Sequence, residues 1–297
     1  MRLTRRHSLV ALAAQIAAAR ESDPAAEWRR IAQSTDGTVG AAALSLETGR
    51  LVSLHGDERF PLLSVCKLPI AMHMLALVDE GKYGLDQRIE VLPEDVVRSV
   101  SPIAERWPAE KQFPLSEMVA LMVAKSDNTA VETFFRIGGG QPAMAERFRQ
   151  WRVAGMRVDR GERQAGVDRR GREREALRDP RDTGTPNGTV QLLARLFRGE
   201  ALSAASTARL IDILKSTATF PTRIKGLLPP GTVVAHKTGS SGVVNGFALA
   251  TNDSGVVYLP KGRQLALAVY LKGSTRPDAE RDRVIARIAR AAYDAFA

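Results

Sequence analysis

The sequence predicts an α+β fold in which an antiparallel sheet of about five strands is assembled from both ends of the chain. Apolar residues alternate with a period of two near the N-terminus and again after position 231, which is typical of strands. Between these regions the apolar residues recur at helical spacing, which indicates an inserted all-α domain. We expect terminal helices to flank the sheet, and the active site to lie in the cleft between the two parts.

The individual elements follow from periodicity and from turn residues. Two N-terminal strands joined near Gly49 form a hairpin, a long helix starts at Ser64 and stops at Gly81, and an amphipathic helix closes the chain. The run 252–255 (Asn-Asp-Ser-Gly) has turn composition, so the strands on either side are predicted to be separate. The predicted strands cover 38–46, 51–54, 232–237, 246–251, 255–259 and 264–271. The predicted helices cover 25–32, 64–80, 115–125, 129–137, 142–152, 189–197, 203–214 and 281–296.

The domains are therefore predicted to be discontinuous in sequence. Residues 20–60 and 215–297 form the α/β domain, and residues 61–214 form the all-α domain. One segment of the all-α domain, 157–183, departs from the helical pattern because arginines, acidic residues and glycines crowd it. We interpret this segment as a long loop, and such a loop in a compact domain is usually either functional or disordered.

Composition places the chain among globular proteins and narrows its chemistry. Hydrophobic residues make up 44% and charged residues 26% of the 297 residues, which excludes collagen-like, mucin-like and mainly disordered chains. The single cysteine, Cys66, excludes an internal disulfide framework and a multi-thiolate metal site, and the four histidines stand singly. We therefore expect no metal and no cofactor.

The formal net charge of +10 allows two interpretations. It could indicate a nucleic-acid partner, or it could reflect only a basic surface. The excess is arginine spread over many segments, without an interleaved aromatic platform or a recognition helix. We therefore favour the basic surface and expect no nucleic-acid partner.

Residues 1–19 have the pattern of an export signal. Arg2, Arg5 and Arg6 precede an apolar stretch over 9–19 that ends in small residues suited to cleavage. The arginine pair also fits a twin-arginine signal, and an ordinary frayed or helical N-terminus is the alternative. The stretch is too short to span a bilayer, and no other stretch approaches about 18 apolar residues. We expect a periplasmic or secreted monomer that does not associate with a membrane after cleavage.

Three short motifs combine the residue types of nucleophilic catalysis. Ser64 and Lys67 stand three residues apart at a predicted helix start, so the hydroxyl and the ammonium project from one face. A serine becomes a nucleophile beside a base, and a lysine with a lowered pKa can serve as that base. The other motifs are the triplet 126–128 (Ser-Asp-Asn) between helices and the triplet 237–239 (Lys-Thr-Gly) at a strand end. Each motif alone has a plainer interpretation as a helix cap or a strand end entering a turn.

Taken together and in this order, the three motifs resemble those of the class A serine β-lactamases and the related penicillin-binding proteins, over about 23–296. The resemblance implies a serine acyl-enzyme formed from a small-molecule β-lactam. It implies catalytic roles for Ser64 as the nucleophile, Lys67 as its proton partner and Ser126 as the proton relay to the leaving nitrogen. It implies substrate-binding roles for Asn128, Lys237, Thr238 and Gly239, an oxyanion hole from the backbone N–H groups of Ser64 and Ser240, and a buried structural carboxylate at Asp127.

The segment 157–183 resembles the omega loop of this family. Glu162 matches the carboxylate that positions the water for hydrolysis of the acyl-enzyme. The family's Leu-Asn pair that helps to hold this water is Ala165-Gly166 here, and the loop is several residues longer, with an Arg-rich insertion. The alternative is that Glu162 is one more surface carboxylate. Arg160 and Asp182 are expected to pair and to pin the two ends of the loop.

Three further residues have softer assignments. Arg223 precedes a stretch where some members of the family supply an arginine toward the substrate carboxylate, and a surface arginine is the alternative. Cys66 is expected to be a small buried residue without a partner. His236 alternates away from Lys237 on the predicted strand and is expected to be structural.

Three functions are compatible with these residues. We favour a β-lactamase that hydrolyses the amide bond of β-lactam antibiotics through a serine acyl-enzyme. A penicillin-binding protein or DD-peptidase-like acyltransferase, which acylates but deacylates slowly, is favoured if the altered omega loop does not hold water. A non-catalytic β-lactam sensor domain is disfavoured because sensors are normally fused to a membrane segment.

Overall fold

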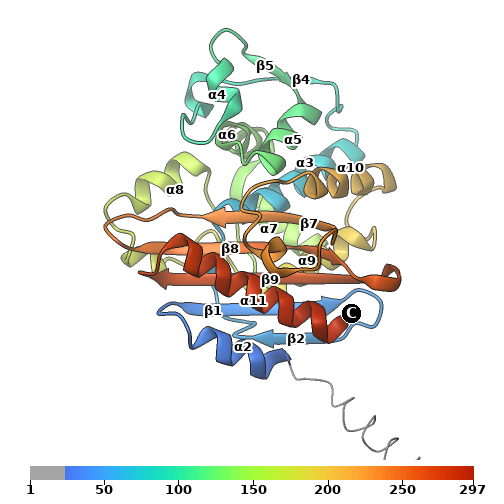
Figure 1. Ribbon diagram of the computed structural model, residues 1–297. Helices are drawn as coiled ribbons and strands as arrows, with labels where there is room; N and C mark the ends of the chain where they lie inside the picture. Colours follow the sequence, from blue (N-terminus) through green and yellow to red (C-terminus); the bar gives the residue numbers. More distant parts are fainter. Residues whose placement is uncertain (1–23) are drawn as a thin grey trace, which may run out of the picture.

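The computed structural model describes residues 24–297, and its centre is a five-stranded antiparallel sheet (Figure 1). The strand order is β2-β1-β9-β8-β7, so the two ends of the chain meet where β1 pairs with β9. The strands are β1 (Thr38–Ser45), β2 (Leu51–Leu54), β7 (Val234–Ser240), β8 (Ala248–Tyr258) and β9 (Gln264–Ser274). The predicted α+β fold with a sheet drawn from both ends is confirmed, whereas the predicted signal at 1–19 lies outside the described residues.

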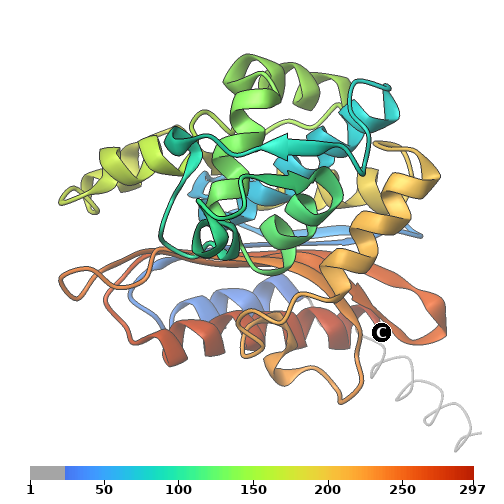
Figure 2. The ribbon, with the colours of Figure 1, turned by 90° about the horizontal axis from the view of Figure 1, so that it is seen from above.

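Two helices cover one face of the sheet, as Figure 2 shows. They are α2 (Pro24–Ala32) and α11 (Asp278–Phe296), from opposite ends of the described chain. Trp28 of α2 is fully buried, and its indole N–H donates to the carbonyl of Ile288 in α11 at 3.2 Å. The apolar stripe predicted on the C-terminal helix packs with these residues and with the sheet, so this face forms its own hydrophobic core.

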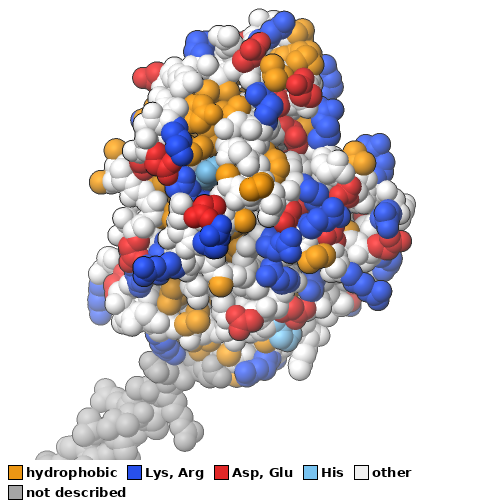
Figure 3. Space-filling view, turned by 180° about the vertical axis from the view of Figure 1, so that it is seen from behind, with side chains coloured by type: hydrophobic (Ala, Val, Ile, Leu, Met, Phe, Trp, Pro, Cys, Tyr) orange, Lys and Arg blue, Asp and Glu red, His pale blue; other side chains and the backbone are white. Residues whose placement is uncertain are grey.

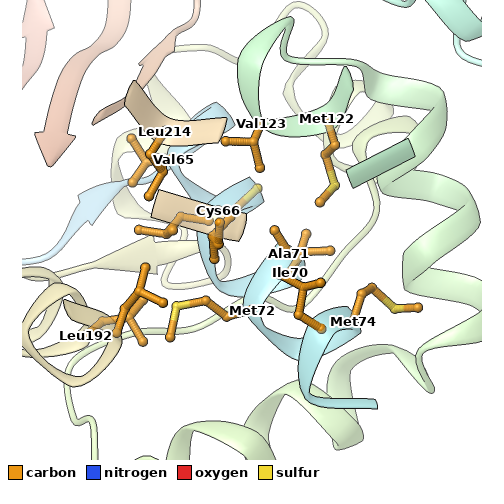
Figure 4. Close-up of a cluster of buried hydrophobic side chains, with 14 of the residues drawn as sticks. Val65, Cys66, Ile70, Ala71, Met72, Met74, Met122, Val123, Leu192 and Leu214 are labelled. Atoms are coloured by element: carbon orange, nitrogen blue, oxygen red, sulfur yellow. The ribbon is translucent and has the colours of Figure 1, made fainter. Parts of the chain in front are cut away.

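The other face of the sheet packs against the helical region in the middle of the chain (Figure 2). At its centre lies α3 (Lys67–Asp79), whose residues 67–77 are all buried. Side chains of α3 meet those of α5, α9 and α10 in the cluster of Figure 4, which includes Cys66. The surrounding helices are α4 (Pro102–Arg106), α5 (Leu115–Ala124), α6 (Asn128–Ile137), α7 (Gly140–Gln150), α8 (Glu162–Arg169), α9 (Pro186–Phe197) and α10 (Ala204–Lys215).

Short elements connect these helices to the sheet. Two small two-stranded sheets pair β3 (Phe60–Pro61) with β6 (Thr183–Gly184) and β4 (Arg88–Glu90) with β5 (Gln112–Pro114). The helix predicted from Ser64 begins as a 3₁₀ turn, η1 (Leu63–Cys66), and continues as α3. Among the helices of residues 24–297, none is both long and apolar enough to cross a membrane.

The turn predicted at 252–255 is wrong, because β8 runs through it without interruption. Its polar side chains are buried, and those of Asn252 and Asp253 find partners inside the protein. The Asp253 carboxylate lies 2.9 Å from His236 Nδ1, and the Asn252 amide donates to the Pro61 carbonyl at 2.7 Å. A Cβ at Gly255 would lie 2.2 Å from the carbonyl oxygen of Ala235, so glycine permits close strand contact here. Tertiary partners therefore override the turn composition of this run.

The segment 157–183 is more ordered than the predicted long loop. It contains the helix α8 and a 3₁₀ turn, η3 (Glu175–Arg178). Ala176 and Leu177 of that turn pack against Leu63 and Leu249, beside the first turn of the long helix. The second half of the segment is therefore attached to the end of the sheet at which β8 begins.

Basic and acidic side chains are interspersed on the face opposite to that of Figure 1, as Figure 3 shows. Many arginines of residues 24–297 contact a carboxylate directly. Arg160, for example, lies within 3.1 Å of three different aspartates. Much of the positive charge of the chain is thus neutralised locally.

Candidate active site

The ammonium group of Lys67 joins the first two sequence motifs. Lys67 is fully buried, and its Nζ lies 3.0 Å from Ser64 Oγ, 2.9 Å from Ser126 Oγ and 2.5 Å from Asn128 Oδ1. It also donates to the carbonyl oxygen of Ser126 at 2.7 Å. Burial lowers the pKa of Lys67, while the nearby Glu162 carboxylate opposes that shift. The amine is therefore placed and tuned to exchange a proton with Ser64 or Ser126.

Two residues with left-handed backbone lie beside this amine. Leu63, directly before Ser64, has a φ of 49°, and Ser126 has a φ of 61°. Residues other than glycine are strained by about 1–3 kcal/mol when their backbone adopts this conformation, and such strain concentrates at functional sites. Asp127 stabilises the backbone after Ser126, where α6 begins. Its buried carboxylate accepts hydrogen bonds from the backbone N–H groups of Ala130 and Ile103 at 2.8 Å each. Asp127 is thus the structural carboxylate that the motif predicts.

The third motif approaches from β7. Lys237 is fully buried, and its Nζ lies 3.3 Å from Ser126 Oγ, so this hydroxyl sits between two lysines. Burial, aided by the charge of Lys67, lowers the pKa of Lys237 to about 7. A Cβ at Gly239 would lie only 2.7 Å from the carbonyl oxygen of Leu62 and 3.2 Å from Ser64 N. Glycine therefore lets the end of β7 pass close to the turn that carries Ser64.

Glu162 enters the site from the first turn of α8. Its Oε1 lies 3.7 Å from Lys67 Nζ and its Oε2 lies 3.9 Å from the guanidinium of Arg169. Its side chain is 16% exposed, so the alternative of an ordinary surface carboxylate is not supported. The carboxylate therefore reaches the same amine that contacts Ser64.

The N-terminus of α8 is held by a residue that sequence analysis missed. Glu132 of α6 accepts a hydrogen bond from the backbone N–H of Arg163 at 2.6 Å. A Cβ at Gly161 would lie 2.4 Å from the same carboxylate, so glycine allows this close approach without displacing it. Burial raises the pKa of Glu132. Its position one helical turn after Asn128 is the signal that could have revealed it.

The predicted pairing of Arg160 with Asp182 is confirmed and belongs to a larger cluster. Arg160 Nε lies 2.6 Å from Asp182, and its NH1 lies 2.6 Å from Asp168 and 3.1 Å from Asp179. Asp182 also accepts from the backbone N–H groups of Asp159 and Arg160. One guanidinium thus connects the start of the segment 157–183, the end of α8 and the residues just before β6.

A cleft of about 430 Å³ opens above the residues of the three motifs and Glu162. Most of the predicted site residues line it, with the two lysines buried beneath. The residues of the predicted site that line the cleft are Ser64, Ser126, Asn128, Glu162, Thr238, Gly239 and Ser240. The wall toward α8 adds Gly166, Arg169, Arg170 and Glu173, which sequence analysis did not select. The cleft therefore brings together all three motifs and the loop.

Arg223 lies elsewhere, behind the end of β7. The alternative of a surface arginine is wrong, because Arg223 is 1% exposed. Its guanidinium donates to Asp282 at 2.7 Å and to the carbonyls of Gly239 and Asn252 at 3.0 and 2.9 Å. It is not among the residues that line the cleft, so its direct contact with a substrate carboxylate stays a prediction. In this structure Arg223 supports the strand edge from behind.

Two other sequence expectations agree with the structure. Cys66 is buried and reduced, and burial raises the pKa of its thiol, which disfavours a reactive thiolate. His236 points away from the cleft and contacts Asp253 and the carbonyl of Thr217. Both residues are therefore structural.

Comparison with known proteins agrees with this geometry. Residues 23–296 match the family model described as the Beta-lactamase enzyme family. The chain is 33% identical to the extended-spectrum beta-lactamase PER-1 of Pseudomonas aeruginosa, over 86% of this chain and 82% of that protein. It is 31% identical to the carbapenem-hydrolyzing beta-lactamase KPC of Klebsiella oxytoca, over 90% of this chain and 87% of that protein.

Solved structures give the same result. A beta-lactamase from Chitinophaga pinensis superposes with a TM-score of 0.85 at 36% identity, covering 92% of this chain and 99% of that one. The TLA-3 extended-spectrum beta-lactamase superposes with a TM-score of 0.83 at 29% identity, covering 91% of this chain and 97% of that one.

The fold and site are those of a serine hydrolase that acts on cyclic amides. The chain belongs to the β-lactamase enzyme family and is a class A serine β-lactamase. The penicillin-binding and sensor alternatives are not favoured.

Proposed function

We propose that this β-lactamase acylates at Ser64 and deacylates with a water activated by Glu162. The observation that carries the proposal is the position of Lys67, whose Nζ lies 3.0 Å from Ser64 Oγ and 3.7 Å from Glu162 Oε1. One buried amine therefore contacts the groups needed in both half-reactions. Each half-reaction requires a proton to leave an attacking oxygen and to reach a leaving atom.

In acylation, Ser64 Oγ attacks the β-lactam carbonyl carbon and loses its proton to the amine of Lys67. The carbonyl oxygen, negative in the tetrahedral intermediate, would be stabilised by the backbone N–H groups of Ser64 and Ser240. Collapse breaks the carbon–nitrogen bond, and the leaving nitrogen takes a proton from Ser126. The contacts of Ser126 Oγ with Lys67 and Lys237 allow that proton to be replaced.

Substrate capture uses the groups at the end of β7. The anionic carboxylate of a β-lactam would be attracted by Lys237 and hydrogen-bonded by Thr238, with Ser126 nearby. Thr238 Oγ1 already shares a hydrogen bond with Thr219 Oγ1 at 2.7 Å, which fixes its orientation. Asn128, whose Nδ2 donates to the Ser99 carbonyl at 2.8 Å, is assigned to the acylamino side chain of the substrate.

In deacylation, Glu162 takes a proton from water as the water oxygen attacks the ester carbonyl. The bond between Ser64 Oγ and the carbonyl carbon then breaks, and Oγ regains a proton that Glu162 returns through Lys67. Gly166 lies one helical turn after Glu162 on the same face and offers no side chain to hold the water. Deacylation is therefore the step whose rate should depend most on the unusual sequence of the loop.

The test is nitrocefin turnover by purified protein, combined with mass spectrometry of the quenched reaction. We expect many turnovers per enzyme, and a transient adduct whose peptide contains Ser64. One equivalent of stable adduct would contradict fast hydrolysis and return the penicillin-binding alternative. An adduct on another residue would contradict the assignment of the nucleophile.

Export, subunit state and domain division are also part of the proposal. The arginines and apolar stretch of residues 1–19 support a cleaved signal and a periplasmic or secreted location, and the mature protein is proposed to be a monomer. The N-terminal sequence of protein recovered from the periplasm or medium tests cleavage, and light scattering tests the monomer. Residues 20–60 with 215–297 and residues 61–214 are proposed as the two domains, which proteolysis at their junctions would test.

A further inference from the structure

The face of α8 that carries Glu162 holds one other charged side chain that reaches the cleft. Residues 162, 166 and 169 follow the i, i+4, i+7 spacing of one helix face, and all three line the cleft. Side chains on a helix point back toward its N-terminus. Arg169 therefore extends toward Glu162, and its NH2 lies 3.9 Å from Glu162 Oε2.

The space between these two residues is open. Gly166 stands between them on the helix, and a Cβ built there would meet nothing within 4 Å. The Arg169 side chain is 29% exposed, so it is neither buried in the core nor free in solvent. A long cationic side chain thus borders the space in which a water beside Glu162 would have to sit.

The Glu162 carboxylate consequently lies between two cations. Lys67 Nζ is 3.7 Å from Oε1 on the floor of the cleft, and the Arg169 guanidinium is 3.9 Å from Oε2 on the outer side. A carboxylate held from both sides keeps one rotamer, and correct placement of a reacting group strongly affects rate. Held from one side only, it could turn outward toward solvent.

We propose that Arg169 is a positioning residue for deacylation, which holds the outer oxygen of Glu162 so that the inner oxygen faces Lys67 and Ser64. The inference rests on the proposed role of Glu162 as the base. Arg169 touches neither the nucleophile nor the acyl group, and it exchanges no proton. Its contribution is to the second half-reaction, because acylation depends on Ser64, Lys67 and Ser126.

The competing explanation is structural. A cation in the last turn of a helix also stabilises that helix through its dipole. Such a role would lower the melting temperature, and the loss of deacylation would follow that loss of stability. The experiment must therefore separate acylation from deacylation and record the melting temperature of each variant.

The experiment compares Arg169→Ala, Arg169→Lys and Arg172→Ala with the unsubstituted enzyme. Arg172 lies in the same insertion and pairs with Glu175 on the surface, so it is the matched control. Stopped-flow mixing with nitrocefin and time-resolved mass spectrometry give the acylation and deacylation rates separately, and thermal unfolding gives the melting temperature, which we expect to be unchanged in Arg169→Ala. For Arg169→Ala we expect deacylation to slow by about 10- to 100-fold, acylation to change less than about twofold, and adduct to accumulate. Arg169→Lys should recover most of the loss, and Arg172→Ala should behave as the unsubstituted enzyme.

Three results would overturn the inference: unchanged deacylation in Arg169→Ala, equal slowing of both half-reactions, or equal losses in Arg169→Ala and Arg169→Lys. Glu162→Gln distinguishes this failure from failure of the proposed function. If Glu162→Gln accumulates adduct and Arg169→Ala does not, only the positioning role is wrong. If Glu162→Gln does not accumulate adduct, the assignment of the base is wrong as well.

Discussion

The floor of the cleft and the wall formed by α8 are built in different ways. On the floor, Lys67 and Lys237 are fully buried and are held by hydroxyl, amide and carbonyl groups. On the wall, Glu162 belongs to the helix α8, and ion pairs hold the segment that contains this helix in place. Arg160 makes three of these ion pairs. The floor is therefore part of the hydrophobic core, whereas the wall is an attachment to it.

This difference separates the two half-reactions in space. The groups assigned to acylation belong to elements that cannot move without disturbing the core, such as α3 and β7. The group assigned to deacylation belongs to a segment whose sequence can change with little effect on that core. The rates of acylation and deacylation should therefore respond differently to substitution, salt and pH.

The largest effect is expected on the floor. Ser64→Ala removes the hydroxyl assigned as the nucleophile, so turnover should fall by at least about 1000-fold. The fold should persist, because Lys67 keeps its contacts with Ser126 and Asn128. Nitrocefin hydrolysis measures the loss, and thermal unfolding measures the fold. Substantial turnover by this variant would show that the nucleophile lies elsewhere.

The next effect is expected on the wall. Glu162→Gln keeps the side chain's size but removes the proton acceptor, so deacylation should slow by about 100- to 1000-fold while acylation continues. Mass spectrometry should reveal an adduct that persists. Glu175→Gln is the control, because Glu175 lies on the exposed 3₁₀ turn and pairs with Arg172. An adduct in Glu175→Gln alone would show that the base comes from the inserted stretch.

A third effect concerns pH and again lies on the floor. Burial lowers the pKa of Lys237 to about 7, so this amine is charged below pH 7 and neutral above it. Because the charged form attracts the substrate carboxylate, kcat/KM should fall by about tenfold between pH 7 and 8.5. A bound anion favours the charged form, so the same limb in kcat should lie at higher pH.

Lys237→Arg tests this explanation, because arginine stays charged throughout this range. Its kcat/KM, normalised to its own value at pH 6.5, should lose the alkaline limb near pH 7. An unchanged limb in the variant would assign it to another group.

The smallest effect is expected in the fastening of the loop. Arg160→Ala leaves Asp168, Asp179 and Asp182 without their shared cation, so α8 should be held less firmly. Deacylation should slow by about fivefold, with acylation unchanged, since substitutions that act only through another residue modulate function by about 0.5–2 kcal/mol. Arg172→Ala, which removes an exposed pair with Glu175, is the control. Equal slowing of acylation would show that floor and wall are not independent.

The strand region illustrates where sequence reasoning failed. The run 252–255 has the composition of a turn, yet it forms the middle of β8. Its partners are His236, 17 residues earlier, and Pro61, 191 residues earlier. Local propensity carries no information about such distant partners, and buried polar groups are stable where those partners exist.

The loop region illustrates the opposite error. Residues 162–169 have weak apolar periodicity, so no helix was predicted there. The helix forms because Glu132 caps its N-terminus from α6 and because Arg160 holds Asp168 near its other end. A short helix without a hydrophobic face depends on such tertiary contacts.

The sequence by itself determined the family, the sheet drawn from both ends of the chain, and the residues of the three motifs. These features are local, since each motif spans three or four positions and each long element has its own periodicity. Only the tertiary structure decided how Lys67 connects Ser64 with Glu162 and that Arg223 lies behind β7. It also decided that Glu132 accepts a hydrogen bond from the first turn of α8 and that Arg169 lies beside Glu162. Those relations depend on distances between elements far apart in the chain, which are set by packing of the core and by burial of charge.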